Sequence, residues 1–253
     1  MPLDQQSVES KRVPTGIPGF DELCEGGLIR DRTYLVSGTS GTGKTIFALQ
    51  FLLNGIKQYG ENGIFIAMEE RPEQLRENME SFGLNIREME AEGKLAIIDA
   101  CSTKIGLPTK EKYVDSRPFD MRALMNQIIV IQEEIGAKRA VLDSTTSIGF
   151  NLNDPSKLRI ELLKLSATLE ILGLTSIMTC EIVDDTQPSR FGVENFVTEG
   201  TIVMYYKLRE NIRARTLEIY KMRGSNHSYK IHPYDIGESG ITVHPNEEVY
   251  TSF

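Results

Sequence analysis

Residues 38–45 read Gly-Thr-Ser-Gly-Thr-Gly-Lys-Thr and constrain the fold and chemistry of this chain more than any other stretch. Apolar residues at 34–37 predict a strand before them, and residues 44–59 predict a buried helix after them. Glycine lets the loop between the two curl, so that its N–H groups point at phosphate oxygens. Lys44 would place its charge on the β- and γ-phosphates, and Thr45 would offer a hydroxyl to Mg²⁺. The pattern therefore predicts a site for ATP and magnesium, with these further contacts: Thr39, Ser40, Gly41, Thr42, Gly43 and Ile46.

Strand and helix patterns alternate through most of the chain. Short apolar runs predict strands at 34–37, 63–67, 95–98, 140–142 and 175–179. Apolar residues spaced by three and four predict helices at 121–135 and 158–172, and Pro72 marks the first turn of a charged helix. This alternation predicts an α/β fold with a mainly parallel sheet and helices on both faces.

The pattern changes after residue 200. Residues 201–206 and 216–220 flank a charged turn and predict a β-hairpin, with further short strands over 227–243. The sheet should therefore end in an antiparallel edge hairpin. No linker or repeat interrupts the chain, so residues 1–253 form one predicted domain. Within it we expect a flexible N-terminal segment at 1–13 and an exposed loop at 101–118.

Charge and cysteine content exclude several classes of protein. The net charge of -8 argues against a constitutive nucleic-acid binder, although a local basic patch would be compatible with it. Cys24, Cys101 and Cys180 have no metal-ligand spacing and read as free thiols of a reducing compartment. No apolar run has the length of a membrane span, and the first residues lack a signal-peptide core. We therefore expect a cytoplasmic protein.

Three carboxylates follow predicted strands and are candidates for the chemistry at the phosphates. Asp143 ends the strand at 140–142 and would hold the magnesium ion, or would cap the segment that follows. Glu69 and Glu70 follow the strand at 63–67, at the same edge of a parallel sheet as the glycine-rich loop. One of them would activate the attacking water. The alternative is a solvated acidic turn before Pro72.

A basic stretch lies near the C-terminus of this acidic chain. Residues 207–232 contain seven Lys or Arg and two Glu. Either the stretch stabilises phosphates, such as those bound by a neighbouring subunit, or it is the solvated face of a hairpin. Thr179 and Glu181 would sense the γ-phosphate or act as caps. His232 and His244 have no ligand-spaced partners, so a structural role is expected for both.

Several segments in order resemble the KaiC branch of the RecA-like ATPases. They include residues 15–23 (Thr-Gly-Ile-Pro-Gly-Phe-Asp-Glu-Leu), Gly26-Gly27-Leu28, the glycine-rich loop and Glu69-Glu70. Glu80-Ser-Phe-Gly83, Glu92-Gly-Lys-Leu95, Leu142-Asp143-Ser144, Arg190-Phe-Gly-Val-Glu194 and Lys221-Met-Arg-Gly-Ser225 with His227 complete the set. The resemblance covers residues 14–245, nearly the whole chain.

The resemblance implies a RecA-like, three-layer α/β/α fold and a ring, usually a hexamer, with ATP bound between subunits. It implies that Glu69 and Glu70 activate the water and that Asp143 serves the magnesium ion. It also implies that one segment contacts the nucleotide of the adjacent subunit, through Lys221, Met222, Arg223, Ser225 and His227. Ser81, Gly237 and Glu238 match positions that lie by the nucleotide in the family.

The resemblance favours a slow ATPase that acts as a regulatory or signalling switch. The alternatives are an ATP-dependent scaffold without hydrolysis, similar to the relatives associated with archaeal motors, and a RecA-type ATPase acting on DNA. A kinase acting on another protein is also compatible with the site. Autokinase activity is not expected, because Asn195 and Phe196 stand where KaiC has its phosphorylated Ser-Thr pair. KaiC carries two such domains in one chain, and this chain carries one.

Overall fold

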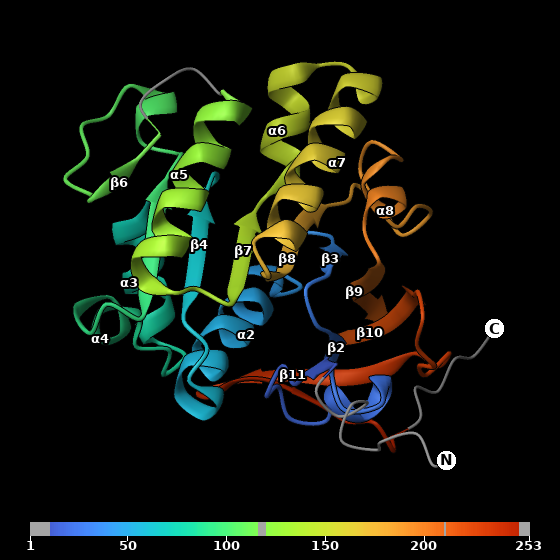
Figure 1. The fold of residues 1–253 in the computed structure, drawn as a ribbon. Coiled ribbons are helices and arrows are strands. Elements are labelled where there is room, and N and C mark those ends of the chain that lie inside the picture. Colours follow the sequence, from blue (N-terminus) through green and yellow to red (C-terminus); the bar gives the residue numbers. More distant parts are fainter. Residues whose placement is uncertain (1–10, 116–119, 210, 248–253) are drawn as a thin grey trace, which may run out of the picture.

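A ten-stranded sheet forms the centre of the fold, with its strands in the order β12-β11-β10-β9-β3-β8-β7-β4-β5-β6 (Figure 1). The computed structural model describes residues 11–115, 120–209 and 211–247. The parallel strands are β3 (Thr33–Gly38), β4 (Gly63–Ala67), β5 (Leu95–Asp99), β6 (Tyr113–Val114), β7 (Arg139–Asp143) and β8 (Thr175–Glu181). Their register brings Ala67 beside Asp143 and Gly38 beside Glu181, so the carboxyl ends of four strands meet at one edge.

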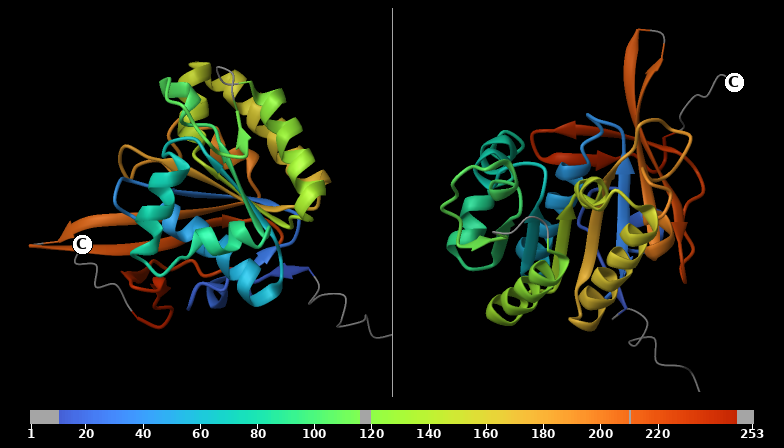
Figure 2. Two further views of the ribbon diagram at one scale, coloured as in Figure 1. Left: turned by 90° about the vertical axis from the view of Figure 1, so that its left-hand side faces the viewer. Right: turned by 90° about the horizontal axis from the view of Figure 1, so that it is seen from above.

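The sheet becomes antiparallel at its other side. β9 (Gly200–Arg209) runs parallel to β3, and β10 (Ile212–Met222), β11 (His232–Gly237) and β12 (Gly240–Val243) follow as an antiparallel series. β3 pairs with β9 only as far as Met204. The rest of the β9–β10 hairpin therefore extends past the sheet as a two-stranded ribbon, which projects clearly in Figure 2.

Helices cover both faces because strand side chains alternate between two cores. Phe65 and Val141 face a core shared with α2 (Lys44–Tyr59), α3 (Pro72–Glu80) and α4 (Ile86–Ala91). Ile66 and Leu142, one residue further along, face a second core shared with α5 (Met121–Ile135), α6 (Thr145–Leu152) and α7 (Pro155–Ile171). The mainly parallel α/β architecture with an antiparallel edge hairpin is thus confirmed.

Local sequence signals set several helix boundaries. Asp120 and Asp154 accept hydrogen bonds from backbone N–H groups in the first turns of α5 and α7. Pro72 and Pro155 occupy the first position of α3 and α7, where a missing N–H costs nothing. Gly60 ends α2 at a positive φ of 65°.

The two segments expected to lack structure differ from that expectation. Residues 1–10 lie outside the described residues, but β1 (Arg12–Val13) pairs with β2 (Leu28–Ile29), and the Val13 side chain is buried. Within 101–118, a 3-10 turn spans Thr103–Ile105 and β6 pairs with β5. Cys101, Ser102 and Asp115 are buried, so the prediction of an exposed loop was wrong for these residues, while 116–118 lie outside the described part.

Three α-helices had no prediction. They are α4, α6 and α8 (Glu194–Val197), all of them short. All three cysteines are buried free thiols, as expected. Within the described ranges, no helix has both the length and the apolar character needed to cross a bilayer.

Candidate functional site

The glycine-rich loop, hereafter the P-loop (residues 38–45), joins β3 to α2 at the carboxyl edge of the sheet. Gly41 and Gly43 have φ values of 81° and 89°, a region that favours glycine. A Cβ on Gly43 would lie 2.7 Å from Cδ1 of Ile236, the end of a side chain that can turn aside, so the positive φ is the stronger reason for glycine there. The loop therefore needs glycine at both positions to keep its curled form.

Lys44 lies folded back over the loop. Its ammonium donates a hydrogen bond to the Thr39 carbonyl at 3.0 Å. Burial lowers the pKa of Lys44, although Asp143 and Glu181 oppose the shift. A partly buried ammonium beside a glycine-rich loop is suited to an anionic ligand, since phosphate oxygens would complete its hydrogen bonds.

Asp143 and Thr45 form the oxygen pair expected of a magnesium site. The Thr45 hydroxyl donates to Oδ2 of Asp143 at 2.7 Å, and the Thr179 hydroxyl donates to Oδ1. Ser144, not Asp143, is the N-cap residue of α6, so the capping alternative for Asp143 is wrong. A hydroxyl and a carboxylate beside a phosphate loop are the hard oxygen ligands that Mg²⁺ prefers, and the residues present fit this ion.

Glu69 extends over the start of α6. Its Oε1 accepts a hydrogen bond from the Ser144 hydroxyl, and the Ser147 hydroxyl lies at 3.5 Å. Because Ser144 directly follows Asp143, these bonds tie Glu69 to the end of β7. Glu69 is exposed and lies in the bend before α3, but its carboxylate is held at the start of α6 by these bonds.

Glu70 takes a different direction, along α3. Its Oε1 accepts a hydrogen bond from the side-chain amide of Asn78. Burial raises the pKa of Glu70, the Asn78 amide lowers it, and the negative charge of Asp143 raises it further. A carboxylate whose pKa is raised toward neutrality has the property required of a general base.

The β9–β10 hairpin covers the outer side of the P-loop. The Arg215 guanidinium stacks on the Tyr206 ring at 4.2 Å, and its Nε donates to the Gly41 carbonyl at 3.4 Å. From the other side, the Tyr234 hydroxyl donates to the Thr42 carbonyl at 2.6 Å. These contacts were missed by sequence reasoning, because they depend on the registers of β9, β10 and β11.

The weaker candidates Ser81, Gly237 and Glu238 lie together beside α2. Ser81 ends α3, and a Cβ on the nearby Gly83 would approach the Glu238 carbonyl to 2.8 Å. The β11–β12 hairpin that carries Gly237 and Glu238 is anchored on α2, where Gln50 exchanges hydrogen bonds with Ile241 at 2.8 and 3.1 Å. The structure thus brings these candidates together on the α2 side of the P-loop.

The basic segment 221–227, hereafter the arm, lies near the amino end of β3, at the opposite end of that strand from the P-loop. The Arg223 N–H donates to the Glu199 carbonyl, and the Glu199 N–H donates to the carbonyl of Thr33, both at 2.9 Å. Thr33 begins β3, so the arm is ~16 Å from Gly38 along the strand and ~10 Å across two strand spacings. The arm is out of reach of the P-loop in its own chain.

The side chains of the arm have partners within the chain. Lys221 donates to the carbonyls of Asn195 and Thr198, the latter at 2.7 Å. Arg223 lies 3.7 Å from a Glu199 oxygen and is half exposed. The other members of the arm are placed as follows: Met222 is buried in the core, Ser225 accepts a hydrogen bond from Arg12 at 2.9 Å, and His227 Nδ1 lies 2.8 Å from the Ser228 carbonyl. Met222, like the buried Ile46, offers a ligand only its backbone.

The remaining polar candidates have structural partners. Thr179 donates to Asp143 and does not cap a helix. Glu181 lies 3.9 Å from Arg190. His232 is buried against the Ser228 hydroxyl at 2.7 Å, and His244 contacts Asp235 at 2.9 Å. Among the residues with described positions, no three His, Cys, Asp or Glu side chains converge as a metal site of their own.

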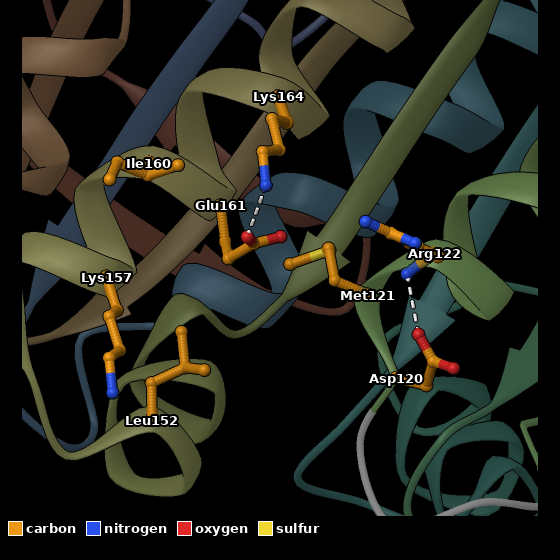
Figure 3. A pocket seen from close by; sticks show the side chains of 8 residues that line it. All are labelled: Asp120, Met121, Arg122, Leu152, Lys157, Ile160, Glu161 and Lys164. Atoms are coloured by element: carbon orange, nitrogen blue, oxygen red, sulfur yellow. Dashed lines mark hydrogen bonds and ion pairs between the residues drawn. The ribbon is translucent and has the colours of Figure 1, made fainter.

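A cavity of about 540 Å³ lies between the start of α5 and the α6–α7 pair (Figure 3). Lys157, Lys164 and Arg122 surround an apolar floor, and Lys164 is paired with Glu161 at 2.7 Å. None of its lining residues belongs to the P-loop or carries one of the three candidate carboxylates. This cavity is therefore separate from the P-loop edge.

Comparison with known proteins shows the family of this chain. A family model described as "ATPase: KaiC" matches residues 13–248. The chain belongs to the KaiC family of ATPases. It is 39% identical over 239 residues to the circadian clock oscillator protein KaiC of Prochlorococcus marinus, covering 94% of this chain and 47% of KaiC. The chain thus spans about half the length of its KaiC relatives.

Two relatives of the KaiC family match this chain over nearly their whole length. The UPF0273 protein MJ1359 of Methanocaldococcus jannaschii is 43% identical, covering 94% of this chain and 98% of that protein. The crystal structure of the KaiC-like protein PH0186 from Pyrococcus horikoshii has a TM-score of 0.80 and 40% identity, over 92% of this chain and 99% of that chain. The KaiC-like, RecA-type fold is therefore shown.

Proposed function

We propose that this protein is a magnesium-dependent ATPase. The observation that carries the proposal is the convergence of the P-loop, Asp143 and the two glutamates at one edge of the sheet. Thr45 and Asp143 would hold the ion, which neutralises charge on the β- and γ-phosphates when bound. The P-loop N–H groups, Lys44 and the start of α2 would bind and orient the phosphates.

Hydrolysis needs a base for the attacking water. Water oxygen bonds to the γ-phosphorus while the bond from that phosphorus to the bridging oxygen breaks, giving ADP and phosphate. Glu70 would take the proton, because its pKa is raised by burial. Glu69, held by the Ser144 and Ser147 hydroxyls, would orient the water beside it.

We further propose that the chain forms a hexameric ring, in which a second copy of the chain completes each site. The arm carries Lys221, Arg223 and His227 at the edge of the sheet opposite the P-loop. Head-to-tail packing would place one copy's arm on the next copy's nucleotide, as an arginine finger is supplied in trans. ATP would then stabilise the subunit interface, and hydrolysis would weaken it, which suits a slow regulatory switch.

The engagement of both glutamates favours hydrolysis over a scaffold that only binds ATP. Phosphate release by the wild type, Lys44→Ala and Glu70→Gln tests the proposal. We expect Lys44→Ala to lose ATP binding, and Glu70→Gln to bind ATP but to hydrolyse it only at a low residual rate. Equal rates for Glu70→Gln and the wild type would refute the catalytic role. Light scattering with and without ATP and magnesium tests the ring, and a monomer under both conditions would refute it.

A further inference from the structure

Asn78 is the side chain that fixes the direction of Glu70. It lies two turns into α3, while Glu70 precedes that helix by two residues. The Asn78 amide nitrogen donates to Oε1 of Glu70, so the glutamate folds back along the helix. Without this bond, the three side-chain torsions of Glu70 would be free to turn its carboxyl group into solvent.

An asparagine at this position is unfavourable for the helix itself. Asn78 is exposed and lies in the last third of a nine-residue helix, where alanine, glutamate or lysine would be better helix formers. No described side chain other than Glu70 bonds to its amide. Asn78 therefore disfavours the helix, while its side-chain amide bonds to Glu70.

The helix that carries Asn78 is held in place from two directions. Leu75 and Met79 pack into the core beneath it. On its flank, the nearly buried Arg76 forms ion pairs at 2.7 Å with Glu90 of α4 and with Glu111. Asn78 therefore projects from a fixed base, which is the requirement for a residue that sets another side chain's geometry.

We propose that Asn78 is the positioning residue of Glu70 and holds the carboxylate in the orientation from which it accepts the proton of the attacking water. This inference rests on the proposed function, because it assigns Glu70 its catalytic role. Asn78 itself touches no reacting atom. Its amide also lowers the pKa of Glu70, which opposes the upward shift caused by burial and by the charge of Asp143.

The test is a double-mutant cycle on the full chain with Asn78→Ala and Glu70→Gln. We expect Asn78→Ala to lower kcat by about tenfold, since a misoriented base loses a large part of its effect, and to leave KM for ATP unchanged. In the Glu70→Gln background, the same substitution should have no further effect. Gln74→Ala, which removes an exposed amide one turn earlier on α3, is the matched control and should keep the wild-type kcat.

The pH profile separates positioning from simple loss of helix structure. Asn78→Ala should move the midpoint of the acidic limb of the kcat–pH profile to higher pH by about half a pH unit. Asn78→Asp should move it further, because aspartate both lacks the donor and adds a negative charge. Unchanged or increased kcat for Asn78→Ala, or an equal loss in the Glu70→Gln background, would overturn the inference. If Glu70→Gln alone hydrolysed ATP normally, the proposed function would fail first and the inference with it.

Discussion

Asp143→Asn should remove the magnesium-dependent part of ATP binding and leave the rest intact. The side chain is almost buried at 9% exposure and accepts hydrogen bonds from Thr45 and Thr179. Asparagine keeps the shape, and a hydroxyl can rotate to accept from the new amide, so we expect the fold to lose only about 1–2 kcal/mol. The loss of a negative charge near a divalent cation is the larger effect.

The magnitude follows from the position of the carboxylate. A unit charge 4 Å from another contributes about 4 kcal/mol at an effective dielectric constant of 20, before desolvation is subtracted. A net loss of ~1.5–3 kcal/mol corresponds to about a 10- to 150-fold weaker affinity for ATP with magnesium. Calorimetric titration with ATP, in magnesium and in EDTA, measures this loss directly. Equal affinity of variant and wild type in magnesium, or an equal loss in EDTA, would refute the assignment.

Three other expectations follow from single contacts. Gly43→Ala should weaken ATP binding at least about tenfold in the same titration, because a φ of 89° is strained for any residue with a side chain. Arg139→Met should lower the melting temperature by roughly 10 °C, since the fully buried Arg139 bonds Glu61 and two backbone carbonyls; the exposed Arg87→Met is the control and should change it little. Hydrolysis should fall as pH drops through the raised pKa of Glu70, giving an acidic limb above the ordinary value of 4.5 that Glu70→Gln lacks.

The sequence predicts those parts of the fold that depend on neighbouring residues. The strand at 63–67 is a continuous apolar run bounded by glycine and acidic residues, and β4 has those bounds. α2 begins and ends at the residues predicted for it, Lys44 and Tyr59. Asp143 and the two glutamates could be placed at the P-loop edge because parallel strands end on the same side of a sheet.

Contacts between distant segments could not be predicted in the same way. Thr179 bonds Asp143 because β8 lies beside β7, and Arg215 reaches Gly41 because the hairpin register aligns them. β6 has only two residues, too few to show a periodic pattern, yet its pairing with β5 orders part of the segment expected to be a loop. α6 begins with hydroxyl residues that favour turns when read alone.

The proposed hydrolytic site is shared by two copies of the chain, so two inactive variants should restore activity when they are mixed. Lys44→Ala has an intact arm, and Arg223→Ala has an intact P-loop. Because the arm and the P-loop lie at opposite edges of one chain, mixed rings would contain interfaces with both parts intact. We predict that each variant alone releases little phosphate and that the mixture recovers a substantial fraction of wild-type activity. A mixture no more active than its components, or an Arg223→Ala variant as active as the wild type, would contradict the shared site.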